Sequence, residues 1–215
     1  LDIETVPANH EYAEMDEDWK SLWERKAAYL KRGEEEAAEA LYERAGIYAE
    51  FGKVICVSLA YFLHKEKSRE FRITSIYGEH EKKVLEDTAK LLKRFNKNSD
   101  YLLCAHNGKE FDFPYLSRRM LINDIELPYM LDISGKKPWE VQHLDTMQLW
   151  KFGDYKHYTS LKLLCKLFGI ESPKSAMDGS QVATVYYDEK DLERISEYCQ
   201  EDTIAVAQLL LKFIG

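Results

Sequence analysis

The chain has 215 residues, of which 45% are hydrophobic and 32% charged, and its formal net charge is −8 at pH 7. This length suits one domain with a substantial core, and no apolar run approaches the ~20 residues of a membrane span, which excludes a membrane-spanning protein. The four cysteines are scattered and form no Cys-x-x-Cys pair, which favours reduced thiols and a cytoplasmic protein. Because the sequence begins at Leu1, inside a predicted strand, we expect further residues upstream.

The acidity is concentrated near the start of the chain. Residues 1–50 carry fourteen Asp and Glu against six Lys and Arg, and the two signs balance in the remainder. A nucleic-acid partner, whose phosphates need Lys and Arg, is therefore not excluded. Residues 136–174 contain seven lysines interleaved with aromatic residues. That pattern fits either a surface that holds a single strand or a solvated loop and helix face.

The predicted elements alternate between strands and helices. After the first strand, residues 14–50 are rich in Glu, Ala and Lys, which predicts an insertion of one or two exposed amphipathic helices. The nearly continuous apolar run at 54–62 predicts a buried strand, with 71–76 as its neighbour. Apolar spacing then predicts a helix over 79–95 and a buried strand over 101–105.

The second half of the chain continues the alternation. A polar turn after residue 105 precedes a predicted helix, and Gly169 is a plausible helix stop. We therefore predict a single α/β domain over residues 1–215. The remaining predicted elements are a helix over 113–122, a loop over 127–139, a short strand over 141–144, and helices over 159–168 and 192–213.

The first candidate site motif is the acidic pair in the first strand. Residues i and i+2 of a strand face the same side, so Asp2 and Glu4 project together and can share a cation. An Asp-x-Glu triplet also arises by chance as a solvated pair. Ile3 and the Thr5-Val6-Pro7 segment favour a strand that emerges from a sheet.

The second motif follows the buried strand that ends near residue 105. Asn107 lies in the polar turn, and Asp112 comes directly after the aromatic Phe111 at a predicted helix start. Ligands of open α/β sheets bind beyond the carboxyl ends of strands, which favours a site here. The alternative is that Asn107 caps the helix and Asp112 is an exposed acid matched to the helix dipole.

The third motif lies on the last predicted helix. Tyr198 and Asp202 are four residues apart and share a face with the apolar stripe, so both point inward. A buried acid needs a partner, and a structural salt bridge with Lys or Arg is the alternative to a functional role. Gathered acids repel one another unless a multivalent cation neutralises them. The oxygen-only ligand set therefore predicts Mg²⁺ or Mn²⁺.

These motifs resemble those of the 3′–5′ exonucleases of the DEDD (DnaQ-like) superfamily, in the subtype with tyrosine in its third motif. The resemblance spans nearly the whole chain and is nearest to stand-alone relatives of the proofreading domain of B-family DNA polymerases. The segments Leu144-Asp145-Thr146 and Asp178 to Val182 are also similar to that group. The resemblance implies a ribonuclease-H-like fold, with a mixed five-stranded β-sheet flanked by α-helices and a helical insertion after the first strand.

The resemblance also implies a two-metal mechanism. Two divalent ions about 3.5–4 Å apart would cleave the terminal phosphodiester, one generating the attacking hydroxide and the other stabilising the leaving 3′ oxygen. The product would be a nucleoside 5′-monophosphate. Asp2 would bridge both ions, and Asp112 would hold the second ion. The full set of implied metal ligands is Asp2, Glu4, Asp112 and Asp202.

The implied substrate contacts lie in the same three motifs. Tyr198 would hydrogen-bond the attacking water, since a phenol with a pKa of roughly 10 positions water better than it acts as a base. Asn107 would contact the substrate backbone, and the Thr5 main-chain N–H would meet the terminal 3′ hydroxyl. Phe111 would wedge or stack the last base.

Some residues fall outside this pattern. His106 and His157 invite comparison with the subtype that uses histidine as its base, but the position of Tyr198 favours tyrosine. We expect His106 to pack at a strand end and His157 to lie at the surface near the substrate. The paired Arg118-Arg119 fits either phosphate contact or an exposed helix face. The acidic insertion fits either a shield over the site or a docking surface for a partner protein.

Three functions compete. The first is a metal-dependent exonuclease acting on the 3′ ends of single-stranded DNA. The second is the same enzyme acting on RNA, because the sequence shows no clear reader of the 2′ hydroxyl. The third is a non-catalytic nucleic-acid-binding or protein-binding module that keeps the fold. The presence of all four acids and Tyr198 favours an enzyme.

Overall fold

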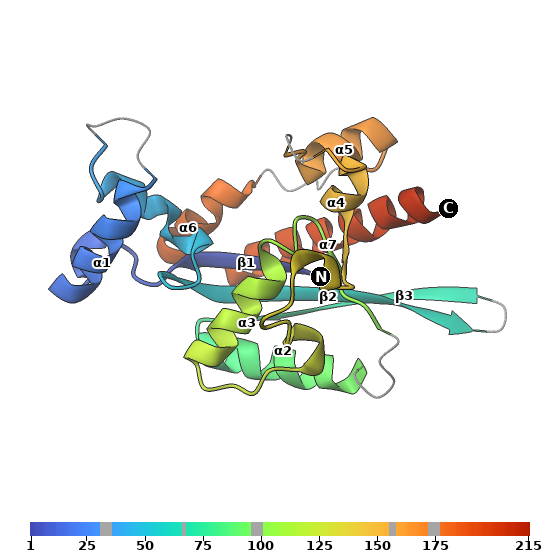
Figure 1. The fold of residues 1–215 in the computed structure, drawn as a ribbon, viewed down its shortest axis with the longest axis horizontal. Helices are drawn as coiled ribbons and strands as arrows, with labels where there is room; N and C mark the ends of the chain where they lie inside the picture. Colours follow the sequence, from blue (N-terminus) through green and yellow to red (C-terminus); the bar gives the residue numbers. More distant parts are fainter. Residues whose placement is uncertain (31–35, 66–67, 96–100, 155–157, 172–176) are drawn as a thin grey trace.

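The computed structural model describes residues 1–215 except 31–35, 66–67, 96–100, 155–157 and 172–176, and shows a mixed α/β fold (Figure 1). Its larger sheet has three antiparallel strands in the order β1-β2-β3. The predicted strands at 54–62 and 71–76 are confirmed, and both are longer than expected. The strands are β1 (Asp2–Pro7), β2 (Gly52–Lys65) and β3 (Ser68–Tyr77).

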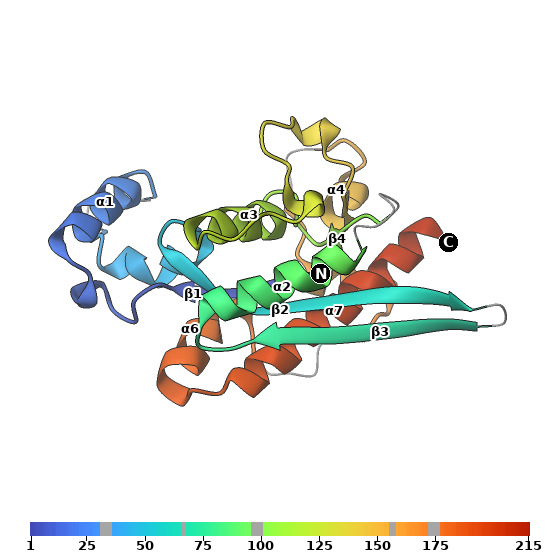
Figure 2. The same cartoon turned by 90° about the horizontal axis from the view of Figure 1, so that it is seen from below.

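Helices cover both faces of this sheet, as the two views in Figures 1 and 2 show. Helix α7 (Leu192–Ile214) lies across one face and contacts all three strands. Helices α2 (Glu81–Phe95) and α3 (Asp112–Ile122) lie on the other face. The three helices predicted at these positions are confirmed to within two residues at each end. The site described below lies on the α7 side of β1.

A second, two-stranded parallel sheet joins β4 (Cys104–Ala105) to β5 (Leu144–Asp145). Both strands are shorter than predicted, because the main-chain N–H of Leu103 donates to the His143 ring rather than to a neighbouring strand. The described residues thus form sheets of three and two strands. Between the described parts of the two sheets, the amino group of Leu1 donates to the Cys104 carbonyl at 2.8 Å.

Strand β1 separates apolar from acidic side chains. Leu1 and Ile3 pack into the core on the α2 and α3 side, whereas Val6 packs into the core under α7. Asp2 and Glu4 share the α7 side with Val6, as the period of two along a strand requires. A bulge between Glu4 and Thr5 shifts the pairing with β2 by one residue.

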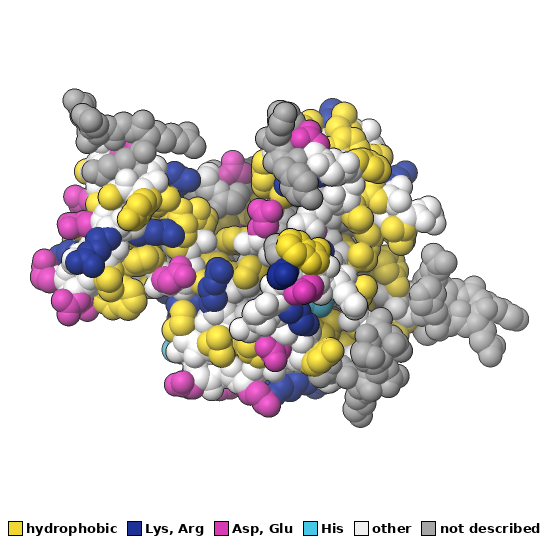
Figure 3. Space-filling view, in the orientation of Figure 1, with side chains coloured by type: hydrophobic (Ala, Val, Ile, Leu, Met, Phe, Trp, Pro, Cys, Tyr) yellow, Lys and Arg dark blue, Asp and Glu magenta, His cyan; other side chains and the backbone are white. Residues whose placement is uncertain are grey.

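The segment between β1 and β2 contains the predicted helical insertion. Helix α1 spans Glu17–Ala28, and a 3₁₀ segment, η2, spans Ala40–Ile47. They have an apolar core of their own, in which Trp23 is fully buried against Tyr42. In the space-filling view, acidic and basic side chains are interspersed over this part of the molecule (Figure 3).

Most of the remaining helices are short and were not predicted individually, whereas α5 matches the helix predicted over 159–168. The loop predicted over 127–139 contains two 3₁₀ turns, and Gly169, at φ 63°, ends α5 as expected. None of the helices in the described part of the chain has both the length and the apolar character that crossing a bilayer requires. The short helices are η1 (Tyr12–Glu14), η4 (Tyr129–Leu131), η5 (Pro138–Glu140), α4 (Thr146–Lys151), α5 (Leu161–Phe168), η6 (Gly179–Gln181), α6 (Val182–Thr184) and the π-helical turn η7 (Val185–Glu189).

Candidate functional site

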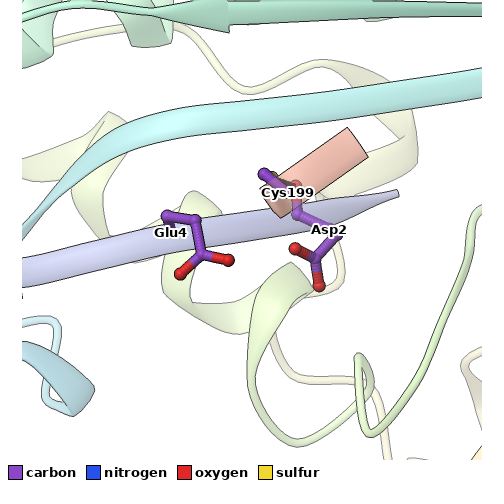
Figure 4. Close-up of side chains that lie close together, drawn as sticks. All are labelled: Asp2, Glu4 and Cys199. Carbon is purple, nitrogen blue, oxygen red and sulfur yellow. Dashed lines mark hydrogen bonds between the residues drawn. The ribbon is translucent and has the colours of Figure 1, made fainter. Parts of the chain in front are cut away.

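The structure brings the acidic side chains of three elements together. Asp2 and Glu4 project from the same side of β1, and Cys199 of α7 lies beside them (Figure 4). A carboxylate oxygen of each acid and the Cys199 sulfur lie within 4.8 Å of one another. Asp112, at the start of α3, and Asp202, in the middle of α7, are close enough for their charges to raise the pKa of Asp2. All four predicted acids thus face one centre.

Burial makes this centre unfavourable for negative charge. Glu4 and Asp112 are only 8% and 4% exposed, and loss of hydration is the largest cause that raises the pKa of all four acids. The pKa of Asp112 rises to about 7 and that of Asp202 to about 6. The pKa values of Asp2 and Glu4 rise well above the usual range, because burial is reinforced by the neighbouring carboxylates.

No lysine or arginine of the described residues neutralises the four acids. Within the described part of the chain, no Lys or Arg side chain forms an ion pair with any of them, so the salt bridge considered for Asp202 is not formed. The Oδ2 atom of Asp2 is buried and accepts no hydrogen bond. A buried polar oxygen without a partner costs free energy, and a cation would remove that cost. The residues present therefore fit a metal ion.

Helix α7 adds two groups to the centre. The Tyr198 hydroxyl donates to the carboxylate of Asp202, one turn later, and burial together with the nearby acids raises the pKa of Tyr198. The phenol therefore stays protonated. The Cys199 thiol donates to the Asp2 carbonyl oxygen at 3.5 Å, and burial raises its pKa well above the usual range. Apart from its place on the inward face of this helix, nothing in the sequence indicated Cys199.

Asp112 is held in place by main-chain hydrogen bonds. Its carboxylate accepts from the N–H of Ile3 on β1, which connects the start of α3 to the first strand. The alternative of an exposed acid is therefore wrong. The proposed capping role of Asn107 is also wrong, because Phe111 occupies the N-cap position of α3 and no side chain caps this end.

Asp145 fixes the turn between β4 and α3. Its two carboxylate oxygens accept from the main-chain N–H groups of Asn107 and Lys109, at 3.0 and 3.1 Å. It also accepts from Met147 and Gln148 and so caps α4. These bonds hold Asn107 at φ 63°, in the left-handed region. Asp145 belongs to the Leu-Asp-Thr segment singled out in the sequence, but nothing there indicated that it would clamp a turn 36–38 residues away.

Two cavities open beside the acidic centre. The first, of about 400 Å³, contains Asp2, Tyr198 and Asp202, with Lys162 as its one cation among the described residues. The second, of about 520 Å³, contains Glu4, Thr5 and Phe111. Tyr158 and Gly179 line both cavities, so the two spaces adjoin at these residues.

The predicted substrate residues are placed unequally. Thr5 and Phe111 line the second cavity, whereas Asn107 lines neither. The Oδ1 atom of Asn107 is buried without a hydrogen-bond partner, and its carbonyl accepts from Glu110 and Phe111. Thr5 and Phe111 are therefore exposed to a ligand in the second cavity, and Asn107 is part of the turn beneath.

Of the two histidines considered in the sequence, the structure describes His106. His106 lies at the end of β4 as expected, and it also lines the first cavity. Its Nε2 atom donates to the Thr159 carbonyl and its Nδ1 bonds to the Thr146 hydroxyl, both at 2.9 Å, which ties the chain beside Tyr158 to the strand end. His157 lies outside the described residues, as do Lys156 and Lys174 of the predicted basic segment.

The expectation for the paired arginines needs correction. Arg118 is exposed, but the Arg119 side chain is only 11% exposed and forms a salt bridge with Glu81 of α2. It is therefore not available to a phosphate. The spacing of residues along α3 could not reveal this pairing, because Arg119 and Glu81 lie 38 positions apart in the sequence.

Comparison with known protein families gives one match. Residues 47–214, more than half of the chain, match the family described as a predicted 3′–5′ exonuclease related to the exonuclease domain of PolB. The matched span contains Asp112, Tyr198 and Asp202 and begins after Asp2 and Glu4. The chain therefore belongs to the family of predicted 3′–5′ exonucleases related to the exonuclease domain of PolB.

Proposed function

We propose that this protein is a metal-dependent 3′–5′ exonuclease that removes nucleoside 5′-monophosphates from single-stranded DNA. The observation that carries the proposal is the cluster of Asp2, Glu4, Asp112 and Asp202, which forms no ion pair with Lys or Arg in the described chain and includes a buried, unpartnered Asp2 oxygen. Membership of the exonuclease family supports phosphodiester hydrolysis as the reaction of this cluster. The cavities beside it give a polynucleotide end a place to enter.

The proposed fold is ribonuclease-H-like, and the subtype is the one with tyrosine in the third motif. The hydrogen bond from Leu1 to Cys104 supports a single five-stranded arrangement in the order β3-β2-β1-β4-β5. Tyr198 supports the tyrosine subtype, because its hydroxyl is directed at Asp202 within the acidic centre.

We assign the metal-binding role to the four acids. Carboxylate oxygens suit Mg²⁺ or Mn²⁺, and the raised pKa of Cys199 leaves its thiol protonated and unsuited as a ligand. Two divalent ions held here would stabilise the negative charge that develops during phosphodiester hydrolysis and lower the pKa of water. Asp2 lies between the other acids and is the ligand on which both ions would depend.

The remaining roles belong to groups of the chain itself. The Tyr198 hydroxyl, whose proton is donated to Asp202, accepts a hydrogen bond from the water that attacks the phosphorus and so orients it, rather than removing its proton. In the second cavity, the Thr5 main-chain N–H binds the terminal 3′ hydroxyl, and Phe111 contacts the last base. Asn107 supports the turn before α3, and the substrate contact that we propose for it is with the sugar-phosphate backbone of the DNA.

The competing functions make different predictions for one experiment. Purified protein is incubated with Mn²⁺ and with DNA or RNA strands of the same sequence, each labelled at its 5′ or its 3′ end. We expect DNA to shorten from the 3′ end with release of mononucleotides. Preferential digestion of RNA would favour the exoribonuclease, and binding without mononucleotide release would favour the non-catalytic module.

Two substitutions link the reaction to the acidic centre. Asp2→Ala and Asp202→Ala should each lower the rate by a factor on the order of 10³, because each removes a ligand worth several kcal/mol of charge stabilisation. Asp87→Ala is the matched control, since Asp87 forms only surface ion pairs with Lys83 and Lys90. Full activity of either site variant would overturn the assignment, provided that circular dichroism shows the fold intact.

A further inference from the structure

The second cavity has one wall made by the insertion between β1 and β2. Glu43, Arg44, Gly46 and Ile47 of η2 line it. The opposite side is made by Gly179, Ser180 and Ala183, and the floor by β1 at Glu4 and Thr5. The family match begins at residue 47, so Arg44 lies outside the matched span.

This wall is fixed against the body of the protein. The buried Tyr115 hydroxyl of α3 donates to the Gly46 carbonyl at 2.7 Å. A Cβ at Gly46 would lie 2.9 Å from the Val6 carbonyl carbon, so the two backbones meet where no side chain fits. Behind the wall, the Trp23 indole donates to the Ala38 carbonyl at 2.7 Å. Arg44 is therefore presented by a packed segment.

Arg44 is the single cation among the described residues that line this cavity. Its side chain is exposed, and it forms no ion pair within the described part of the chain. A guanidinium presents five N–H donors in a rigid plane, which suits phosphate and the acceptor atoms of nucleobases. Its donors are thus available to a ligand in the cavity.

The other lining groups suit the same ligand. Phe111 and Tyr158 offer aromatic faces on which a base can stack, and Thr5 and Ser180 offer hydroxyl groups. A volume of about 520 Å³ lies in the range typical of small-ligand sites. A nucleotide combines an aromatic base with a polar sugar and an anionic phosphate, and it matches this combination of groups.

We propose that η2 forms part of the substrate site and that Arg44 binds the 3′-terminal nucleotide, a positioning role that rests on the proposed exonuclease function. The insertion then shapes the site directly. Arg44 acts on binding of the end to be cleaved, whereas the acids of β1, α3 and α7 act on the bond.

The first test uses 2′-deoxythymidine 5′-monophosphate, the proposed product, with Ca²⁺ present and binding measured by isothermal titration calorimetry. Arg44→Ala should weaken binding about tenfold, the effect of losing a charge-assisted hydrogen bond, and Arg44→Lys should restore part of it. Arg25→Ala is the matched control, because Arg25 is exposed on α1 of the same insertion but does not line the cavity.

The second test separates binding from chemistry. With a short single-stranded DNA and Mn²⁺, Arg44→Ala should raise KM about tenfold and leave kcat within twofold. Its melting temperature should match that of the wild type, because Arg44 is exposed.

The outcomes distinguish this inference from the proposed function. If the wild type degrades DNA while Arg44→Ala has unchanged KM and mononucleotide affinity, the role of Arg44 is overturned and the exonuclease stands. If mononucleotide binding depends on Arg44 but no strand is degraded, the nucleotide site stands and the exonuclease fails. Absence of mononucleotide binding by the wild type overturns the inference.

Discussion

Two groups of buried carboxylates in this protein differ in whether the chain supplies their positive charge. Glu81 of α2 accepts from the Arg119 Nε atom at 2.8 Å, from the Val54 main-chain N–H at 2.8 Å and from Asn123 at 3.1 Å. Asp2 and its three acidic neighbours form no ion pair with a Lys or Arg side chain in the described chain, and an oxygen of Asp2 lacks any partner.

The contrast separates a structural acid from one that awaits a ligand. The buried charge of Glu81 is compensated by hydrogen bonds from Arg119 and Val54, and these bonds connect α2 to α3 and β2. At Asp2 the cost of burying charge is not met by the chain, which is expected where a site binds a cation from solution. Burial alone therefore does not identify a functional acid. The presence or absence of a cationic partner within the fold distinguishes the two kinds.

The largest expected effect comes from removing the cation of the structural pair. Arg119→Met leaves the Glu81 carboxylate unpaired and deprives the Ala49 carbonyl of its donor, and it should lower the free energy of unfolding by about 4 kcal/mol. Urea denaturation measures this, with the exposed neighbour Arg118→Met as the control. Equal losses of unfolding free energy in the two variants would show that the Arg119–Glu81 pair does not stabilise the fold.

The second-largest expected effect on stability comes from supplying a cation to the acidic centre. Saturating Mn²⁺ should stabilise the wild type by about 2.7 kcal/mol at a hundredfold excess over Kd, and EDTA should reverse it. Thermal unfolding followed by fluorescence gives the shift. Asp2→Asn should lose it, whereas Asp87→Asn should keep it. A Mn²⁺ response that is the same in Asp2→Asn and the wild type would remove the distinction between the two groups.

A third buried acid, Asp145, tests whether main-chain donors can substitute for a cation. Asp145→Asn replaces one acceptor oxygen by an NH₂ group that faces N–H donors, and it should cost about 2 kcal/mol. Asp178→Asn is the control, because Asn serves as well as Asp at this exposed N-cap. Urea denaturation compares the two. A loss no larger than in the control would mean that the clamp on Asn107 is weak.

The smallest effect has the opposite sign. In EDTA, Asp2→Asn should raise the free energy of unfolding by about 1 kcal/mol, since it removes a buried acid that lies among other acids. Urea denaturation in EDTA measures this, and Asp87→Asn should show no gain. A destabilised Asp2→Asn would indicate that the chain, rather than a metal, already satisfies this carboxylate.

The parts of the fold that follow from local periodicity were predictable. Alternation in β1 put Asp2 and Glu4 on one face, and the four-residue spacing on α7 put Tyr198 beside Asp202. Helices such as α2 and α3 begin and end within two residues of the prediction, because apolar spacing marks their extent.

The parts that depend on distant partners were not predictable. Neither interpretation of Arg119, a phosphate contact or an exposed helix face, was right, because its partner Glu81 lies 38 residues away and no local pattern encodes that pairing. The same holds for the Asp145 clamp, for Cys199 and for the bulge at which β2 has one more residue than β1. Strand β4 was predicted too long, because the His143 ring takes the N–H of Leu103.

The anchoring of η2 by Tyr115 has a consequence for how the insertion can vary. Tyr115 follows Asp112 by three residues on α3, and its hydroxyl meets both Gly46 and Thr5. One helical turn thus sets the spacing between the acidic centre and the far rim of the cavity. Exposed positions of α1 can therefore change without disturbing that spacing, as long as the buried Trp23, the tyrosine and the glycine remain.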